Sequence, residues 1–461
     1  MKYTSTTIKT HADLYTPVGL YYRLREVFPE VLLLESSDYS SKEDSYSFLV
    51  CEALEGLEVR KGLTTYFQNN KPTSTKPVAN FVQEFQAYMG SLEIEADETS
   101  HKYNGLFGYT GFEACKYFDK DLYIADKPSY DLPEIKYSLY RFVMVIDHVS
   151  DDLYIIETKP EGDESKLSLL KQIIQRPVNT AHDFKLNGSI GTNQTDEEFK
   201  KAVTICKSHC QRGDVFQIVP SRRFQQQYVG DEFNVYRKLR SINPSPYLFF
   251  FDYGSFKIFG SSPEAQIIVK NGVAEIHPIA GTVRRSGDLE IDAQKAQELL
   301  VNPKENAEHI MLVDLARNDL SKNTNGVYVS KYRELQRFSH VYHLVSIVKG
   351  KLKSNVSSYQ VFADTFPAGT LSGAPKYMAI QLIDELEPTK RGYYGGGLGV
   401  INFNGNLNHA IMIRSFLAHQ NTLYFQAGAG VVIDSTEEGE LNEVNNKLAA
   451  LNKALIEAED F

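Results

Sequence analysis

Two pairs of glutamates have a spacing that could place them in a metal site. Glu305 and Glu308 lie in KENAEHIMLVDLARND, and Glu440 and Glu443 lie in AGAGVVIDSTEEGELNEVNNK. Both segments are predicted to be helical, and residues three apart share one face of a helix. If the two faces met at one cleft, a hard divalent cation such as Mg²⁺ would offset the repulsion among the four carboxylates. For either pair alone, a solvated helix face is the simpler interpretation.

Four further side chains could act on a substrate. Arg414 lies within the apolar IMIRSF, where a guanidinium needs a carboxylate from a substrate or from the protein itself. Glu264 follows SSP after a predicted strand, and burial there would raise its pKa and make it a proton donor. His343 in SHVYHLVS is either a packed core histidine or a participant in proton transfer. Gln217 in DVFQIVPSR is neutral, so it cannot serve as a base.

Glycines gather where strands or helices are expected to end. Such clusters let backbone N–H groups approach an anion closely, although ordinary turns give the same pattern. They comprise Gly281, Gly369 and Gly373, Gly395 to Gly397, and Gly428 with Gly430. Several together suggest a site for a multiply charged small molecule.

The composition excludes several classes of partner. The 461 residues contain 49 Lys and Arg against 59 Asp and Glu, a formal charge of −10, with no long basic run, so we expect no nucleic acid. No apolar stretch is long enough to span a bilayer, so we expect a cytoplasmic protein and no membrane. Cys206, His209 and Cys210 could share a helix face, but a fourth ligand is missing, and ordinary packing is preferred to zinc.

The order of predicted elements favours an α+β fold. Alternating apolar runs from Val31 to about Ile156 predict an antiparallel sheet. The polar stretch Pro177 to Gln194 predicts an exposed linker, which places the boundary between a sheet-rich region, 1–190, and a catalytic domain, 191–461. Thr195 and Glu198 form a capping-box pattern that opens a helix ending at Gly213. We expect large, mostly antiparallel sheets packed as a sandwich with helices outside, and no doubly wound nucleotide fold.

A series of motifs resembles the chorismate-utilising enzymes, specifically the family of anthranilate synthase component I. In chain order they are LLLESS (32–37), NPSPYLFF (243–250), SSPE (261–264), HPIAGT (277–282), KENAEHIMLVDLARND (304–319), GTLSGAPK (369–376), IMIRS (411–415) and AGAGVVIDS (427–435). The resemblance covers almost the whole chain. It is far more specific than any single glycine cluster or glutamate pair.

The resemblance implies how chorismate would be held. It assigns Glu308 and Glu443 to Mg²⁺, which would bind the ring carboxylate of chorismate. The other contacts implied for the substrate are Arg414 with the backbone of Gly428, Ala429 and Gly430 at the enolpyruvyl carboxylate, and Gly281 with Thr282 along the ring. Val400 stands where these enzymes usually have a Tyr beside a substrate carboxylate, so one hydrogen bond is expected to be lost.

The resemblance also implies the reaction. Glu264 would protonate the departing C4 hydroxyl while ammonia attacks C2, and His343 would take part in the following elimination of pyruvate. Relatives that use water carry a Lys at the position of Gln217, and aminodeoxychorismate synthases carry a Lys at that of Ala280. Both residues therefore favour an anthranilate synthase. The alternatives are an aminodeoxychorismate synthase, or an inactive homologue kept as a tryptophan-binding module.

A partner and an effector follow from the same resemblance. None of the four cysteines lies in a glutaminase-like motif such as GxCxG, so a separate glutamine amidotransferase subunit is expected in a hetero-oligomer. LLLESS and NPSPYLFF resemble the tryptophan feedback site of the family, which implicates Ser36, Pro246, Tyr247 and Leu248. Tyr46 occupies a position where some family members have Lys, which leaves the strength of tryptophan inhibition open.

Overall fold

The computed structural model describes residues 2–36, 45–178, 182–337 and 341–460. Its helices are α1 (Pro17–Arg25), α2 (Phe81–Ser91), α3 (Glu98–Tyr103), α4 (Leu167–Ile174), α5 (Asp196–Arg212), α6 (Phe233–Ile242), α7 (Leu289–Val301), α8 (Pro303–Ser321), α9 (Ser358–Thr365), α10 (Lys376–Leu386) and α11 (Glu437–Glu457), with short 3-10 turns η1 (Phe112–Tyr117), η2 (Gly369–Leu371) and η3 (Ala458–Asp460). No helix in these ranges is long and apolar enough to cross a membrane.

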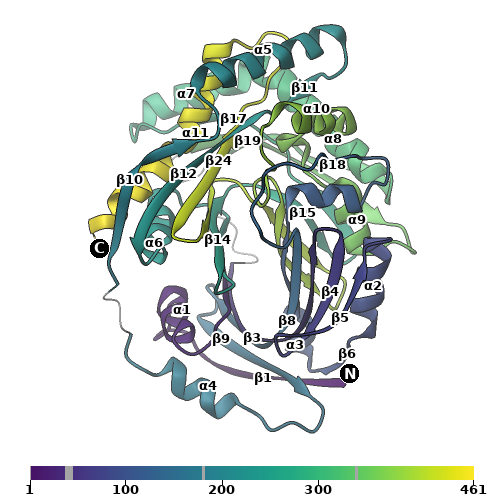
Figure 1. The fold of residues 1–461 in the computed structure, drawn as a ribbon, viewed down its shortest axis with the longest axis vertical. Coiled ribbons are helices and arrows are strands. Elements are labelled where there is room, and N and C mark those ends of the chain that lie inside the picture. The colour runs from purple at the N-terminus through teal and green to yellow at the C-terminus, as the bar shows by residue number, and fades with distance from the viewer. Residues whose placement is uncertain (1, 37–44, 179–181, 338–340, 461) are drawn as a thin grey trace.

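The strands form one large, mostly antiparallel hydrogen-bonded network, and a small separate pair joins β11 to β20 (Figure 1). They are β1 (Lys2–His11), β2 (Val31–Glu35), β3 (Tyr46–Arg60), β4 (Leu63–Gln68), β5 (Lys71–Pro77), β6 (Glu93–Ala96), β7 (Gly105–Thr110), β8 (Ile135–Asp147), β9 (Asp152–Pro160), β10 (Phe184–Thr192), β11 (Gln217–Ile218), β12 (Ser221–Gly230), β13 (Tyr247–Asp252), β14 (Phe256–Ser262), β15 (Ala265–Lys270), β16 (Val273–Ile276), β17 (Ile279–Arg284), β18 (Thr324–Arg337), β19 (Val341–Leu352), β20 (Gly373–Ala374), β21 (Gly397–Asn402), β22 (Leu407–Ile411), β23 (Ser415–His419) and β24 (Thr422–Gly428). Within the described ranges, only β1 with β6 pairs in parallel. The predicted fold class is therefore confirmed.

Strands from both halves of the chain share the network. β2 pairs with β13, and β7 pairs with β21, so the first 190 residues contribute to the same sheet as the rest. The division at residue 190 stays a prediction. The predicted linker is wrong in part, because Phe184–Thr192 forms β10 and pairs with β12. Its polar composition suits an edge strand with one exposed face, which alternation of apolar residues does not reveal.

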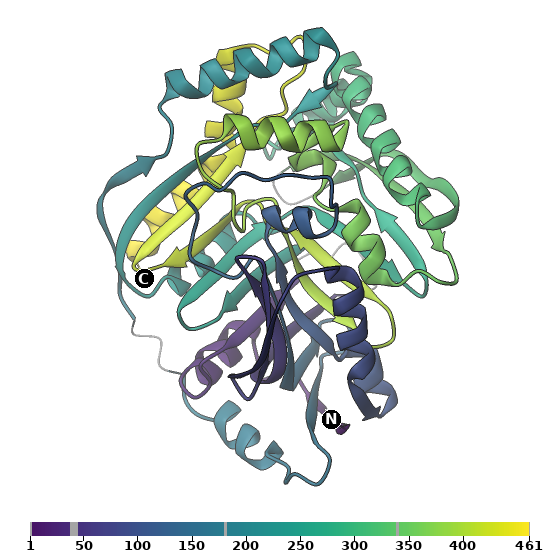
Figure 2. The same cartoon turned by 45° about the vertical axis from the view of Figure 1, so that its right-hand side comes forward.

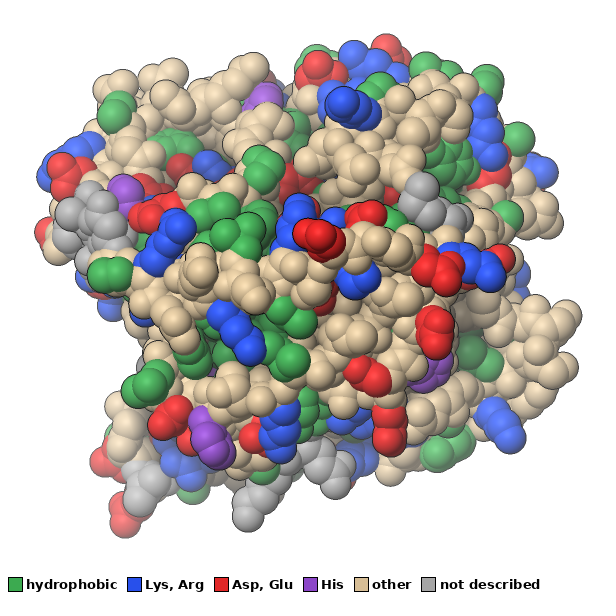
Figure 3. Space-filling model, turned by 90° about the horizontal axis from the view of Figure 1, so that it is seen from below, with side chains coloured by type: hydrophobic (Ala, Val, Ile, Leu, Met, Phe, Trp, Pro, Cys, Tyr) green, Lys and Arg blue, Asp and Glu red, His purple; other side chains and the backbone are tan. Residues whose placement is uncertain are grey.

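The helices cover the outside of the sheet (Figures 1 and 2). On α11, buried Val444, Leu448, Leu451 and Leu455 form one apolar stripe that packs against α5, α6 and β24. The helix α5 has the predicted capping box at Thr195. Its predicted end at Gly213 is confirmed by a left-handed C-cap, φ 81°. In the face seen in Figure 3, acidic and basic side chains are interspersed.

Candidate active site

Glu308 on α8 lies against Gln217 and Gly430. Gln217 is buried, and its Nε2 donates to Glu308 Oε1 at 3.3 Å. A Cβ built on Gly430 would lie 2.6 Å from that nitrogen and 3.9 Å from the carboxylate oxygen. Only glycine therefore fits at 430 without displacing the amide. Because the NH₂ group faces the carboxylate, Oε1 of Gln217 points elsewhere, and this buried atom has no hydrogen-bond partner in the described ranges.

Glu443 on α11 lies close to Gly428. Lys447, one helical turn further on, contacts Glu443 Oε1 at 2.7 Å and donates to the carbonyl oxygen of Gly428 at 2.8 Å. The N–H of Gly428 hydrogen-bonds the phenol oxygen of Tyr394. Burial raises the pKa of this phenol, the charge of Arg391 opposes that rise, and the charges of Glu387 and then Glu443 add to it. Glu443 and Tyr394 thus approach the same glycine.

The segment Gly428 to Gly430 therefore has an acidic side chain beside each of its ends. Its backbone is held from behind, because the N–H of Ala429 donates to Pro220 O at 3.1 Å and that of Val431 donates to Ile218 O at 2.8 Å. The N–H of Ala429 is therefore already hydrogen-bonded within the protein. Ala429 can hold Gly428 and Gly430 in position, but its N–H is not directed at a substrate.

Glu264, two residues after the end of β14, is a half-buried acid of the site. Its Oε1 accepts a hydrogen bond from Thr370 Oγ1 at 2.9 Å. Burial raises its pKa to about 7, against the opposing effects of Thr370, Lys447 and Arg414. A carboxyl with this pKa is protonated in part of the molecules at neutral pH and can donate that proton.

Arg414 lies between β22 and β23 with a half-buried side chain. Its φ of 49° is a left-handed conformation that a non-glycine residue adopts only under constraint, and such residues often occur at functional sites. Burial lowers the pKa of its guanidinium, against the opposing charge of Glu264. In the described ranges the guanidinium has no hydrogen bond or ion pair, so it could accept an anion as its partner.

His343 on β19 lies beside Gly281 on β17. Burial and the charge of Arg414 lower its pKa to about 4, so the imidazole is neutral at pH 7. Its Nδ1 is 3.3 Å from the carbonyl oxygen of Gly281, and because a carbonyl can only accept, Nδ1 carries the proton. The basic lone pair is then on Nε2. Gly281 has φ 70°, and a Cβ there would lie 3.1 Å from Glu305 Oε2.

Two further predicted site residues, Thr282 and Val400, lie on β17 and β21. Thr282 pairs with His343 in the β17–β19 register, but its side chain lies outside the described part of the structure. Val400 is buried within β21 between Phe107 and Asn408 and belongs to an apolar cluster. The phenol that does lie beside Gly428 and Glu443 belongs to Tyr394, which the sequence reasoning missed.

Comparison with known proteins supplies the family. Residues 46–453 match the model of the chorismate binding enzymes. The chain is 35% identical to anthranilate synthase component 1 of Aquifex aeolicus, over 97% of this chain and 94% of that protein. It is 36% identical to the protein of the same name from Neisseria meningitidis serogroup C, over 95% and 92%.

The chain belongs to the anthranilate synthase component I family of chorismate binding enzymes.

Solved structures agree with this membership. Anthranilate synthase component I from Streptococcus pneumoniae superposes with a TM-score of 0.77 at 30% identity, covering 96% of this chain and 98% of that one. The menaquinone-specific isochorismate synthase of Escherichia coli superposes with a TM-score of 0.75 at 17% identity, covering 98% and 94%, which shows a shared fold only. This chorismate binding enzyme therefore has the architecture of its family.

The donor set of this family member suits a hard divalent cation. Glu308 and Glu443 offer carboxylate oxygens on either side of Gly428–Gly430, and oxygen ligands are those that Mg²⁺ prefers. In the described ranges no three His, Cys, Asp or Glu side chains cluster, so water or substrate oxygens would complete the shell. Glu443 would have to share its carboxylate between the cation and Lys447.

The four residues assigned to an effector lie together at one end of the β2–β13 pair. Leu248 pairs with Glu35, so Ser36 follows β2 next to Tyr247, with Pro246 directly before it. Tyr247 in turn pairs with Ser262 on β14, two residues before Glu264. The strip of residues expected to bind an effector is thus one strand away from the acid of the site.

Thr370, Tyr394 and Lys447 complete the site and were not predicted. Sequence signals existed for two of them. Thr370 lies in the GTLSGAPK motif, and Lys447 follows Glu443 by four residues, the spacing of a helical ion pair. Cys206 is buried in the core and His209 contacts Asp214 at 2.8 Å, which agrees with the ordinary packing preferred for that helix face.

Proposed function

We propose that this enzyme converts chorismate and ammonia into anthranilate and pyruvate with Mg²⁺, as the large subunit of a tryptophan-regulated anthranilate synthase. The proposal is carried by one observation. A guanidinium without an ion-pair partner in the described ranges, Arg414, lies near a carboxyl with a raised pKa, Glu264, and a neutral imidazole, His343. These three groups suit a dicarboxylate substrate, because Arg414 would bind a carboxylate, Glu264 would protonate the departing hydroxyl, and His343 would accept a proton.

Substrate binding would use the charges around the two glycines. Arg414 would take the enolpyruvyl carboxylate, with the phenol of Tyr394 and the backbone of Gly430 alongside, while Gly428 holds that phenol in place. Glu308 and Glu443 would hold Mg²⁺, which when bound would neutralise and fix the ring carboxylate. Gly281 has no side chain, so the ring of chorismate would lie close to the backbone of β17 there.

The two chemical steps would use two proton-transfer groups. Protonated Glu264 would give its proton to the C4 hydroxyl, which leaves as water while ammonia bonds to C2. Neutral His343 would then accept the C2 proton through Nε2 as the ether C–O bond breaks, and the departing enolate would take up a proton at its methylene carbon to become pyruvate. The ring becomes aromatic in that step.

Gln217 supports ammonia as the nucleophile. Its amide cannot deprotonate water, but its buried Oε1 can accept an N–H from ammonia. Ala280 on β17 is buried and apolar, which leaves no amine there to attack the ring. These two residues support the anthranilate reaction over the aminodeoxychorismate reaction.

A second subunit and an effector belong to the proposal. The relatives are named component 1, which supports a partner component, here a glutamine amidotransferase that supplies ammonia. Tryptophan would bind at Ser36, Pro246, Tyr247 and Leu248. A displacement of β13 there would act on β14, since the N–H of Ser261 donates to the carbonyl oxygen of Arg414 at 3.1 Å.

The test is incubation of the purified chain with chorismate, Mg²⁺ and an ammonium salt. Anthranilate fluorescence with an equal amount of pyruvate is expected. An aminated product without pyruvate would indicate the aminodeoxychorismate reaction instead, and turnover of neither kind would indicate the inactive homologue. Glu308→Gln should abolish most of the Mg²⁺-dependent rate while the circular dichroism spectrum stays unchanged. Full activity of that variant would contradict the metal role.

A further inference from the structure

A fully buried ion pair lies behind the candidate site and touches it only at Tyr394, whose ring centroid is 5.7 Å from the guanidinium carbon of Arg391. Arg391 is 1% exposed and Glu387 5% exposed. Nε of Arg391 donates to Glu387 Oε2 at 2.9 Å, and a terminal nitrogen donates to Oε1 at 2.6 Å, so the pair is bidentate. Burial and the charge of Glu387 act in opposite directions on the guanidinium, and its pKa ends up raised. Neither side chain has a contact with Glu264, Arg414 or His343 among the described hydrogen bonds and ion pairs.

The guanidinium also holds two backbone segments. Its remaining bonds run to the carbonyl oxygens of Leu371 and Val219, both at 2.6 Å. Leu371 directly follows Thr370, the hydroxyl partner of Glu264. Val219 lies two residues after Gln217, and its own N–H donates to Ser372 O at 3.0 Å. One side chain thus joins the segment beside the proton donor to the segment beside the proposed ammonia position.

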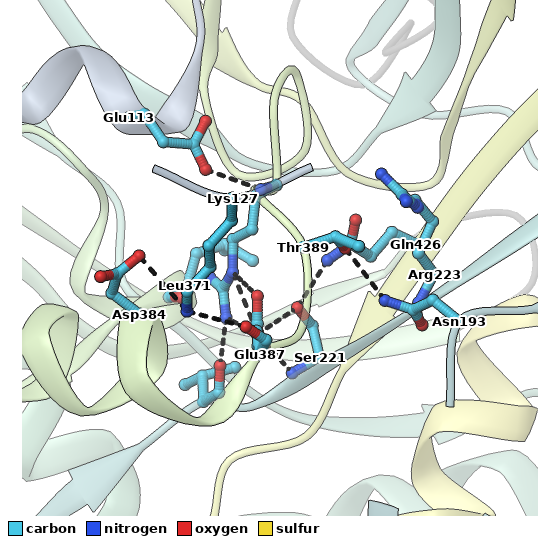
Figure 4. Close-up of polar contacts among 12 residues, drawn as sticks. Glu113, Lys127, Asn193, Ser221, Arg223, Leu371, Asp384, Glu387, Thr389 and Gln426 are labelled. Atoms are coloured by element: carbon cyan, nitrogen blue, oxygen red, sulfur yellow. Dashed lines mark hydrogen bonds and ion pairs between the residues drawn. The ribbon is translucent and has the colours of Figure 1, made fainter. Parts of the chain in front are cut away.

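The carboxylate extends the same connection to the glycines. Glu387 Oε1 accepts from the backbone N–H of Ser221 at 2.8 Å and from its hydroxyl at 2.6 Å. Ser221 pairs with Gly428 in the β12–β24 ladder. Figure 4 shows Glu387 in the middle of these contacts, with Ser221 and Leu371 on different sides of it and Glu113 further out. Glu113, on η1, accepts the N–H groups of Arg391 and Gly392 at 2.6 and 2.9 Å.

We propose that Arg391 and Glu387 are positioning residues of this enzyme, which set the relative placement of Thr370, Gln217 and Gly428. A lysine could keep the charge at 391, but its single ammonium cannot reproduce a planar fork that reaches two carbonyls and a carboxylate. The inference rests on the proposed function only where it names Glu264 as the proton donor.

Arg391→Lys is the decisive variant, and Arg141→Lys is its matched control. Arg141 is also buried, at 5% exposed, and pairs with Glu52 at 3.1 Å and Glu157 at 3.7 Å, but it lies on β8, where no described contact joins it to the site. We expect Arg391→Lys to lower kcat by about 10- to 100-fold per folded molecule, as small displacements of reacting groups do. Arg141→Lys should lower the Tm similarly and leave kcat within about twofold.

A double-mutant cycle with Thr370→Val separates positioning from general loosening. If Arg391 acts through Thr370, the double variant should be scarcely slower than the slower single variant. Fully multiplied effects, or an unchanged kcat in Arg391→Lys, would overturn the proposal. If Arg391→Lys does not fold, Ser221→Ala removes one hydroxyl bond to Glu387 and should still lower kcat about threefold to tenfold. An unchanged rate in that variant would also overturn it.

Hydrogen exchange tests the inference independently of any reaction. In Arg391→Lys, the Val219 amide and the peptide 368–373 should exchange at least about 10-fold faster, while both remain protected in Arg141→Lys. Equal protection in the two variants would refute the connection. A wild-type chain that releases no pyruvate would refute the proposed function, and the exchange measurement would still decide this inference.

Discussion

Arg391 and Arg414 occupy two regions of the molecule and differ in what their guanidinium groups contact. Arg391 is bound by Glu387 and by two backbone carbonyls, and its pKa is raised. For Arg414 the described ranges contain no hydrogen bond or ion pair of the guanidinium, its pKa is lowered, and its backbone has a left-handed φ. Arg391 thus has its partners within the protein, whereas a ligand carboxylate is the partner that we propose for Arg414.

The difference between the two arginines separates a buried charge that stabilises the fold from a buried charge that binds a substrate. A buried charge that stabilises the fold has its ion-pair and hydrogen-bond partners within the protein, and removing one partner of such an ion pair is strongly destabilising. A charge that the reaction needs is held in place by the backbone and satisfied by the substrate. Substitutions at both arginines should therefore lower activity, but only those at Arg391 should also lower the free energy of unfolding.

The largest expected effect is that of Arg414→Met. We expect kcat/KM for chorismate to fall about 1,000-fold, equivalent to about 4 kcal/mol, because the substrate carboxylate loses its charged partner. The free energy of unfolding should be unchanged or higher, since a guanidinium without an ion-pair partner no longer has to be desolvated. Steady-state kinetics and urea unfolding measure the two quantities. A loss of stability of several kcal/mol would remove the distinction from Arg391.

Next in size is Glu264→Gln, for which we expect a loss of about 100- to 1,000-fold in kcat. The wild-type rate should fall as pH rises through about 7, because the proton donor ionises, and the variant should lack this limb. The pKa of the folded state is above the ordinary 4.5, so the contribution of Glu264 to stability is complete below about 4.5 and is lost as pH rises through about 7. Thermal unfolding of both proteins from pH 4 to 9 should show the curves diverging in that window.

Gln217→Met should have an effect of intermediate size, which is confined to the kinetic constant for ammonium. Methionine matches the length of the glutamine but lacks the amide oxygen, so we expect the KM for ammonium to rise about 10-fold. The KM for chorismate should change less than twofold. Initial rates at varied ammonium and fixed chorismate provide the measurement, and equal changes in both constants would contradict a specific ammonia contact.

The smallest effect expected is that of Tyr394→Phe. Loss of one hydroxyl beside Gly428 should raise the KM for chorismate about fivefold, equivalent to about 1 kcal/mol. The neighbouring Tyr393 offers a control, because its hydroxyl donates to the carbonyls of Ser415 and Tyr424 at 3.1 and 2.9 Å. Tyr393→Phe should lower the Tm and leave the KM unchanged. A larger KM effect at 393 than at 394 would reverse the assignment.

Much of the fold, and the helices that carry the candidate metal ligands, could be predicted from sequence, because periodic apolar patterns and long motifs are local. The helices carrying Glu308 and Glu443, the mostly antiparallel sheet and the capping box at Thr195 are of this kind. The strand β10 was missed because a polar edge strand resembles a loop. Tyr394 was missed because two adjacent tyrosines are indistinguishable until the backbone directs one toward Gly428.

The Arg391–Glu387 pair could not have been predicted for a physical reason. A glutamate at the end of a helix and an arginine four residues later have the spacing of an exposed ion pair, which contributes little. The pair is buried because η1, η2 and the residue that follows β11 pack around it, and those segments are distant in sequence. The same holds for Arg414, because its three-dimensional surroundings decide that its guanidinium has no ion-pair partner among the residues described by the structure.

Gly430 has a consequence for how the reaction could be altered by protein engineering. Any side chain at 430 meets the amide of Gln217 at 2.6 Å, so the two positions cannot be varied independently. A library that randomises 430 would mostly report the displacement of Gln217, whatever else it sampled. A search for variants accepting nucleophiles such as hydroxylamine or small primary amines should therefore keep glycine at 430 and diversify position 217 alone.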